Sequence, residues 1–456
     1  MSGRSASCFL LVILLAADAA AGDATARGWT FGLKRHVYAY RPGMSVWSTA
    51  AAGRVDGRAV VAAGSYDNNV YLFDAATGER IWRFTTGNGV YSAPVFWEDG
   101  GDQWIFAASS DRAVYGLDSR LGSRRWSRAV AEYSSTLGGS RLSAPCLGEA
   151  KGVEAVFVGY WVFDKSLARS TQQGGLVALE ARTGKPVWDA RFLDNEVSAP
   201  VYARIGGRGM VFVASEDGNL RALDADSGEL VWSHRETEPI MASPLVHDSP
   251  QGERVVIGSH FGKVRSLDAR TGKEIWSFQT GNWVTGGAAH YADGERGIIA
   301  VGSYNRKLYA LDAATGEKIF SQTVAGPIYS TPVVVAAGAE PVIVFSAWDH
   351  QMHGLSGRDG THLWSVFTGN PLWDGVILGE SNWASPVAAE IGGFWMLYLG
   401  SYNGVFYAIP LSQAAMAGGS QPWTDIRFWI TMLLALGFTA WLSLYLTRRY
   451  RRYYLP

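Results

Sequence analysis

The chain has few of the residues that build covalent, redox or metal centres. Its 456 residues include two cysteines, Cys8 and Cys146, and eight scattered histidines. We expect Cys8 to be removed with an export signal, and Cys146 alone forms no intramolecular disulfide, structural zinc site or redox pair. No Ser-His-Asp order, glycine-rich phosphate loop or paired zinc motif stands out. The sequence therefore offers no familiar catalytic motif.

The chain also has no excess of charge of either sign, with 40 basic and 41 acidic residues. Nucleic-acid affinity depends on basic side chains that release counterions from phosphates, so we predict that the chain does not bind nucleic acid. A hydrophobic content of 48% with 13% aromatic residues is instead typical of a globular protein with a large core.

Both ends of the chain have membrane-targeting character. The N-terminus has one basic residue, Arg4, a short apolar run and small residues up to Gly22, which predicts a cleaved export signal. Residues 426–446 are apolar and long enough to cross a bilayer, and four arginines follow between 448 and 452. We predict a single transmembrane helix with the short C-terminal tail, 447–456, in the cytoplasm.

Between these ends one unit recurs with a period of 44 residues. It is clearest at 264–278, where an apolar strand pattern is followed by Asp268, Gly272 and Trp276. The aromatic residue of the unit returns every 44 residues from Trp188 to Trp364, and the same interval separates Trp82 from Trp126. A fixed period in this range is typical of supersecondary units that cannot bury their apolar faces alone.

Each unit reads as a four-stranded antiparallel meander. Asp-Gly and Ser-Gly turns separate alternating strands, and an inner strand marked by small residues such as Ser198-Ala-Pro200 begins the unit. Eight inner strands are recognisable, so we predict an all-β, eight-bladed β-propeller. The last unit lacks its tryptophan strand, and we expect the segment around Trp29 to supply it and close the ring.

The predicted organisation is an export signal at 1–22, a propeller at 23–411, a linker at 412–425, a transmembrane helix at 426–446 and a basic tail at 447–456. The bulk of the protein is thus expected in the periplasm or outside the cell, held at the cytoplasmic membrane.

The pattern Leu-Asp-Ala-x-Thr-Gly-x-x-x-Trp, clearest at Leu267 to Trp276, resembles the repeat of pyrroloquinoline-quinone-type β-propellers. This family includes quinone-dependent alcohol dehydrogenases and non-catalytic members such as the lipoprotein of the outer-membrane-barrel assembly machinery, which the chain resembles more closely. The resemblance implies that the repeat glycines and tryptophans serve blade docking. These residues are Gly78, Trp82, Trp126, Gly184, Trp188, Gly228, Trp232, Gly272, Trp276, Gly316 and Trp364.

The dehydrogenase branch would need pyrroloquinoline quinone, calcium and a catalytic carboxylate. The chain lacks the adjacent cysteines that many members stack against the quinone. Aspartates in the turns after the second strands, such as Asp67 and Asp349, are explained by turn chemistry. We therefore predict no cofactor, metal or catalytic residue and favour a non-enzymatic protein, while a divergent quinone-dependent oxidoreductase stays open.

Insertions at 130–139, 160–173 and 370–383 break the 44-residue period. In a four-stranded meander all three fall on one rim of the ring, and loops at such rims commonly bind partners. The candidate partner-binding residues are Trp161, Phe163, Trp373, Trp383, Tyr66, Tyr304, Tyr402, His260 and Trp348. Inherited turn sequence would also explain the tyrosines, and a hydrophobic plug over the central channel would also explain the inserted aromatics.

These observations predict a membrane-anchored scaffold or assembly factor that binds an envelope protein at this rim. A quinone-dependent dehydrogenase and a receptor for a small extracellular ligand are the alternatives.

Overall fold

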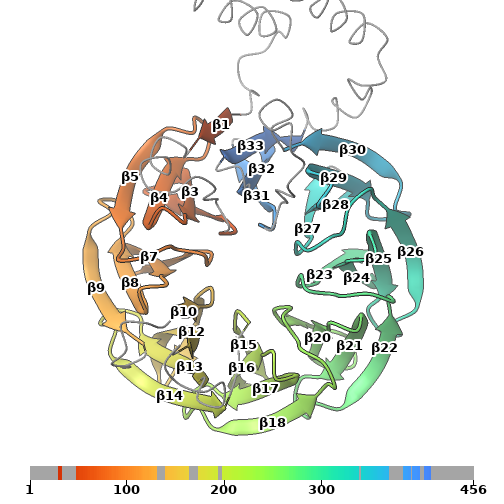
Figure 1. Cartoon of the computed structure of the whole chain (residues 1–456), viewed down its shortest axis with the longest axis horizontal. Helices are drawn as coiled ribbons and strands as arrows, with labels where there is room; N and C mark the ends of the chain where they lie inside the picture. Colours follow the sequence, from red (N-terminus) through yellow and green to blue (C-terminus); the bar gives the residue numbers. More distant parts are fainter. Residues whose placement is uncertain are drawn as a thin grey trace, which may run out of the picture.

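The computed structural model describes residues 29–32, 48–130, 139–163, 173–193, 198–337, 340–368, 384–391, 393–400 and 405–411. These residues form eight antiparallel sheets arranged radially around one axis (Figure 1). The predicted β-propeller is therefore confirmed. Within the described ranges no helix is long and apolar enough to cross a membrane, and the predicted span at 426–446 lies outside them.

The strands run in chain order from the axis outward, except that blade 3 has an additional strand and blade 8 takes its outer strand, β1, from the other end of the propeller. Blades 1 to 4 are β2 (Ala51–Val55), β3 (Arg58–Gly64), β4 (Asn69–Asp74), β5 (Arg80–Thr85); β6 (Val95–Asp99), β7 (Asp102–Ala108), β8 (Ala113–Asp118), β9 (Arg124–Ala129); β10 (Gly139–Leu142), β11 (Cys146–Ala150), β12 (Val153–Phe163), β13 (Gln173–Glu180), β14 (Pro186–Leu193); and β15 (Val201–Ile205), β16 (Arg208–Ala214), β17 (Asn219–Asp224), β18 (Leu230–Arg235). Blades 5 to 8 are β19 (Leu245–His247), β20 (Arg254–Gly258), β21 (Lys263–Asp268), β22 (Glu274–Gln279); β23 (Ala289–Asp293), β24 (Arg296–Ser303), β25 (Lys307–Asp312), β26 (Lys318–Thr323); β27 (Val333–Ala337), β28 (Glu340–Ser346), β29 (Gln351–Ser356), β30 (His362–Phe367); and β31 (Val387–Ile391), β32 (Phe394–Gly400), β33 (Val405–Pro410) with β1 (Trp29–Gly32).

The ring closes with strands from both ends of the chain, as the sequence predicts. β1 pairs antiparallel with β33 and becomes the outer strand of blade 8. Trp29 lies opposite Ala408, and in blade 4 Trp232 lies opposite Ala222 at the corresponding place. The N-terminal strand therefore occupies the tryptophan-strand position that the last repeat lacks.

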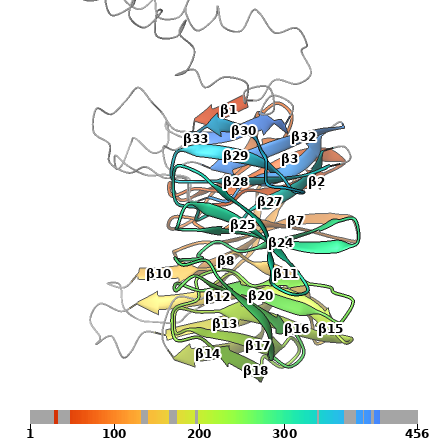
Figure 2. The same ribbon diagram turned by 90° about the vertical axis from the view of Figure 1, so that its right-hand side faces the viewer.

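Blade 3 departs from the predicted four strands. Both β10 and β11 pair with β12, which is 11 residues long, so this sheet has five strands. Residues 160–163, expected to be loop, instead pair with 139–142 and lengthen the sheet beyond its neighbours on one side of the ring (Figure 2). Gly175 makes this possible, because a Cβ there would lie 2.4 Å from the ring of Tyr160.

The Ser-Ala-Pro marks precede the inner strands, which corrects the prediction that they form part of them. β15, for example, begins at Val201, directly after Pro200. The serine still bonds to the second strand, because Ser198 Oγ accepts the N–H of Ala214 at 3.1 Å and the hydroxyl of Ser143 accepts that of Gly159 at 2.8 Å. Each serine thus extends the ladder beyond the inner strand, because its backbone N–H donates to the carbonyl of the same residue whose N–H its hydroxyl accepts.

Neighbouring blades dock through the tryptophan of one repeat and the glycine of the next. Trp232 Nε1 donates to Ala269 O at 3.0 Å, and its ring lies against Gly272, where a Cβ would come within 2.6 Å. Gly272 also has a φ of +72°, which favours glycine at this turn. Equivalent contacts join Trp82 to Gly122, Trp126 to Gly184, Trp188 to Gly228, and Trp276 to Gly316. Gly78 has a φ of +73° at the same turn of blade 1, and Trp364 is 1% exposed among apolar residues of blades 7 and 8.

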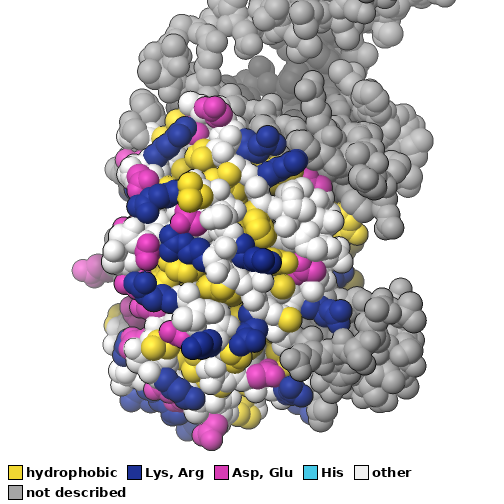
Figure 3. All heavy atoms as spheres, turned by 90° about the vertical axis from the view of Figure 1, so that its left-hand side faces the viewer, with side chains coloured by type: hydrophobic (Ala, Val, Ile, Leu, Met, Phe, Trp, Pro, Cys, Tyr) yellow, Lys and Arg dark blue, Asp and Glu magenta, His cyan; other side chains and the backbone are white. Residues whose placement is uncertain are grey.

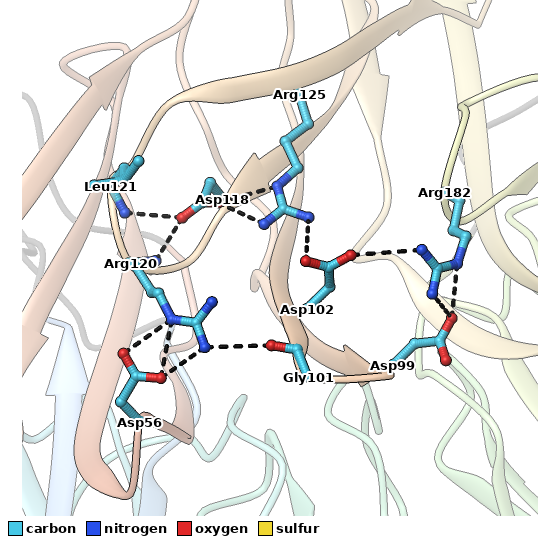
Figure 4. Close-up of polar contacts among 9 residues, drawn as sticks. All are labelled: Asp56, Asp99, Gly101, Asp102, Asp118, Arg120, Leu121, Arg125 and Arg182. Atoms are coloured by element: carbon cyan, nitrogen blue, oxygen red, sulfur yellow. Dashed lines mark hydrogen bonds and ion pairs between the residues drawn. The ribbon is translucent and has the colours of Figure 1, made fainter.

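A second set of contacts joins blades 1, 2 and 3 (Figure 4). Arg120 of blade 2 bonds to Asp56 of blade 1 at 2.7 Å, and Arg182 of blade 3 bonds to Asp99 of blade 2. Within blade 2, Arg125 forms ion pairs with both Asp118 and Asp102. These exposed or half-exposed ion pairs add modestly to stability, because solvent screens them.

Candidate functional site

One rim of the ring carries the turns between second and third strands together with the loops that enter the inner strands. Backbone hydrogen bonds connect the two sets. The N–H of Tyr304 donates to Trp283 O at 2.8 Å, that of Trp348 to Pro327 O at 2.9 Å, and that of His260 to Pro239 O at 3.1 Å. These hydrogen bonds fix the backbone from which the side chains of this rim project.

Five aromatic rings on the rim of blades 5 to 7 form a continuous run, here named the aromatic rim. It consists of His260, Trp283, Tyr304, Tyr329 and Trp348. His260 stacks on Trp283 with centroids 4.8 Å apart, and Trp283 lies 5.4 Å from Tyr304. Tyr304 meets Tyr329 edge-on at 5.3 Å, and Tyr329 stacks on Trp348 at 4.4 Å. Three of the nine predicted residues are therefore brought together.

The aromatic rim is bordered by exposed apolar side chains. Trp283 itself is 44% exposed, and the neighbouring Phe261 and Met241 are 59% and 38% exposed. Met241 Sδ lies 2.8 Å from His260 Nε2, which connects it to the run. Large apolar groups grouped on a surface are typical of an interaction site, whereas scattered ones are not.

Burial governs the titration of this cluster. Desolvation lowers the pKa of His260 against the opposing charge of Glu238, so its imidazole is favoured in the neutral form. Desolvation and the neighbouring Tyr304 hydroxyl raise the pKa of Tyr329. His260 and Tyr329 are therefore favoured in their uncharged forms near neutral pH, as suits contact with an apolar or aromatic partner.

A smaller aromatic pair lies on the rim of blades 1 and 2. Tyr66 packs edge-on against Tyr91 with centroids 5.0 Å apart. Trp161 is half-buried in the extended strand β12 of blade 3, where its Cα pairs with those of Arg141 and Gly174. These residues share the ring with the aromatic rim but belong to other blades.

Four predicted residues remain: the structure describes only the backbone of one and does not describe the other three. The backbone of Phe163 pairs with Gly139 at the end of β12, while Trp373, Trp383 and Tyr402 lie outside the described residues.

The structure adds rim residues that the repeat pattern did not single out, of which Trp283 and Tyr329 belong to the aromatic rim. Tyr91, Met241 and Tyr329 each precede the small residue that marks an inner strand, and Trp283 lies in the corresponding loop of blade 6. A scan of the position before the marks Ser92-Ala-Pro94, Ala242-Ser-Pro244 and Ser330-Thr-Pro332 would have found the first three. The same scan would have missed Trp283, because the inner strand of blade 6 has no such mark.

The turn aspartates on the same rim are used within the turns. Asp111 accepts hydrogen bonds from Ala113 N at 3.0 Å and from the hydroxyl of Tyr115. Asp349 is bonded to His353 Nε2 at 3.0 Å; burial acts to raise the pKa of Asp349, but bonding to His353 and to backbone donors outweighs it and lowers the pKa. No group of three or more His, Cys, Asp or Glu side chains that could hold a metal occurs among the described residues. These residues do not fit the calcium cage that a quinone cofactor of the dehydrogenase type would need.

Comparison with known families gives one match over most of the chain. The family described as outer membrane protein assembly factor BamB matches residues 16–160, 148–282 and 260–388.

Similar proteins of known activity match only short segments. The chain is 33% identical over 69 residues to quinoprotein alcohol dehydrogenase PedE of Pseudomonas putida, which is 15% of this chain and 10% of that protein. It is 45% identical over 42 residues to 1-butanol dehydrogenase (quinone) of Thauera butanivorans, 9% of this chain and 7% of that protein. The matched segments thus span about a tenth of these relatives or less, the length of one or two repeats.

Similar solved structures share the fold. BamB from Moraxella catarrhalis aligns with a TM-score of 0.56 at 16% identity, covering 83% of this chain and 98% of that one. Quinohemoprotein alcohol dehydrogenase from Comamonas testosteroni aligns with a TM-score of 0.61 at 13% identity, covering 86% and 76%. The propeller is therefore common to an assembly factor and to an alcohol dehydrogenase, and the fold alone does not choose between these functions.

Proposed function

The chain belongs to the family described as outer membrane protein assembly factor BamB, and from that premise we propose that it is a non-enzymatic scaffold of the cell envelope. In this proposal the aromatic rim binds a protein partner. The helix at 426–446 tethers the propeller to the cytoplasmic membrane with the ring on the outer side.

The aromatic rim carries the proposal. His260, Trp283, Tyr304, Tyr329 and Trp348 form one connected surface on a bonded backbone, with Phe261 and Met241 exposed beside it. Rigid aromatic side chains provide large contact areas at a small entropic cost, and they are over-represented among the residues that dominate binding energy. A neutral surface of this kind favours a protein partner over an ionic small molecule.

In-cell cross-linking tests the proposal. A photo-reactive residue is placed at Phe261 and at Trp283, and at Leu230, which is 57% exposed on the outer strand of blade 4. We expect the same envelope protein to be captured from both rim positions and not from Leu230. Trp283→Ala should also reduce capture from position 261. Capture from all three positions, or from none, contradicts rim-specific binding.

The membrane tether has a separate test. Full-length protein and a version that ends at residue 425 are compared by flotation of membrane fractions. The tether predicts that the full chain floats with membranes after alkaline extraction and that the shortened chain does not. A full chain that stays in the soluble fraction contradicts the tether without bearing on the aromatic rim.

A quinone-dependent dehydrogenase activity would require different behaviour. The purified protein is incubated with pyrroloquinoline quinone and calcium, and quinone absorbance and alcohol-dependent dye reduction are recorded. The scaffold proposal predicts neither signal. Both signals together would overturn it in favour of an enzyme.

A further inference from the structure

The outer strands of the ring differ sharply in charge from one side to the other. β5 and β9, the outer strands of blades 1 and 2, contain five arginines and no acidic residue. β18, β22, β26 and β30, the outer strands of blades 4 to 7, contain Arg, Lys and Glu once each. Positive charge is thus concentrated on one wall of a chain whose overall charge is near zero.

Four of these arginines are exposed and are here named the basic wall: Arg80, Arg83, Arg124 and Arg128. The fifth, Arg125, is half-buried, lies 4.2 Å from the Trp104 ring centroid and is paired with Asp118, as Figure 4 shows. Dark blue Lys and Arg side chains are spread along the length of this side of the ring in Figure 3.

Most of the acidic groups near the basic wall that the structure describes are already in ion pairs. Glu79, in the turn before β5, is exposed and reduces the local positive charge. Asp56 and Asp102 lie in the ion-pair network of Arg120, Arg125 and Arg182. The wall therefore keeps a net positive charge.

The end of the propeller brings the chain close to this wall. β33 ends at Pro410 in blade 8, which packs directly on blade 1. The hydroxyl of Tyr398 donates to Ala75 O across this boundary at 2.9 Å. Residues 412–425 then form the predicted linker, which reaches at most about 50 Å when fully extended. A tethered ring consequently stays within reach of the bilayer, with blade 1 beside the point of exit.

We propose that the basic wall lies against the anionic phospholipid headgroups of the membrane to which the chain is tethered. The proposal rests on the tether of the proposed function. Basic residues near an anionic bilayer are attracted to it within about one Debye length, roughly 8–10 Å. The wall on blades 1 and 2 would hold the ring on edge, which leaves the aromatic rim of blades 5 to 7 away from the lipid surface.

Fluorescence quenching by labelled lipids tests this orientation. Full-length protein is reconstituted into vesicles of phosphatidylcholine alone or with phosphatidylglycerol, each with a quencher on the lipid headgroup. A fluorophore is attached at Ser127→Cys or at Ser277→Cys in a Cys146→Ser background. Both serines are exposed and directly follow the tryptophan of an outer strand, Ser127 on the basic wall and Ser277 on the far wall. We expect quenching at position 127 only, only with phosphatidylglycerol, and lost at high salt.

Charge removal gives the second arm. Arg80→Gln, Arg83→Gln and Arg124→Gln together should lower quenching at position 127, with apparent affinity for anionic vesicles falling roughly tenfold or more. The matched control, Arg235→Gln, Lys273→Gln and Lys318→Gln on the far side, should leave it unchanged. Equal quenching at both labels, or quenching that is independent of phosphatidylglycerol, overturns the proposal and leaves an acidic protein as the alternative partner of the wall.

Failure of the tether is distinguishable from failure of this proposal. If the full chain does not insert, its co-sedimentation with phosphatidylglycerol vesicles measures the wall directly. Binding that the three arginine substitutions abolish would support the wall without the helix, and no binding would contradict both.

Discussion

The imidazole of His260 lies flat against the indole of Trp283, with the two planes 9° from parallel and the centroids 4.8 Å apart. His260 belongs to a turn of blade 5, whereas Trp283 belongs to the loop that enters blade 6. The stack thus joins two repeats at the surface, where the contact adds little to the core. Its position is better explained by binding than by folding.

Trp283→Ala should therefore weaken partner binding while leaving the fold intact. Because Trp283 is 44% exposed, we expect the free energy of unfolding to change by less than about 1 kcal/mol. Partner affinity should fall by about 2 kcal/mol, roughly thirtyfold, if the residue is an aromatic anchor. Denaturant unfolding and affinity measurement with the captured partner check the two numbers. Leu230→Ala, on an exposed outer strand, is the control and should affect neither.

Gly272→Ala should destabilise the ring at the boundary of blades 4 and 5. Its φ of +72° disfavours a side chain, and the added Cβ would lie 2.6 Å from the Trp232 ring. We expect a loss of about 2–4 kcal/mol in the free energy of unfolding. Gly294→Ala separates the two causes, because Gly294 has a φ of +65° but no atom within 4 Å of the new Cβ. Equal losses for both substitutions would show that the tryptophan contact contributes nothing.

Removal of β1 should open the ring. A chain that begins after Gly32 loses the pairing of β1 with β33, on the order of 1 kcal/mol for each backbone hydrogen bond lost. The matched control begins at Trp29 and keeps the strand. Thermal unfolding should show a lower midpoint only for the shorter chain. Equal midpoints would mean that the eighth blade is stable with three strands.

The stacked pair of His247 and His290 should make stability sensitive to acid. Burial lowers the pKa of His247 from 6.5 to about 4, opposed by the backbone of Asp248 and assisted by His290 and Arg254. The folded state thus favours the neutral form, so this contribution is complete above pH 6.5 and is lost as pH falls toward 4. The loss amounts to about 3 kcal/mol.

His247→Phe should reduce this dependence, since Trp97 and Tyr291 occupy the corresponding place in blades 2 and 6. Urea unfolding at several pH values between 7.5 and 4 measures the slope. A slope that is identical in the variant and the parent would contradict the assignment to His247.

The sequence predicts the architecture well because the repeats share one pattern of strands, turn glycines and aromatic residues. The 44-residue period, the turn glycines and the missing last tryptophan strand specify the eight blades and the role of β1. The fifth strand of blade 3 is different, because nothing in 160–163 departs enough from an inserted loop to reveal its pairing with 139–142, about twenty residues earlier. The pairing depends on Gly175, whose lack of a side chain becomes meaningful only once Tyr160 is placed beside it.

The candidate site was only partly predictable for a related reason. Tyr304, His260 and Trp348 occupy turn positions that recur in every blade, so the pattern identifies them. Trp283 and Tyr329 lie in loops that vary between repeats, and their importance arises from contacts with the preceding blade, Trp283 with His260 and Tyr329 with Tyr304. Such contacts follow from the curvature of the ring, which no single repeat encodes.

The pairing of β1 with β33 also sets an order of events during synthesis. β1 leaves the ribosome first, yet its partner begins at Val405, 373 residues after Gly32. Throughout that interval the growing arc of blades exposes an unpaired strand edge at each end, a known template for aggregation. The ring thus closes only when β33 has been synthesised, and an interrupted nascent chain is left with two unpaired strand edges. A chaperone that shields strand edges would be needed most just before synthesis of β33 is complete.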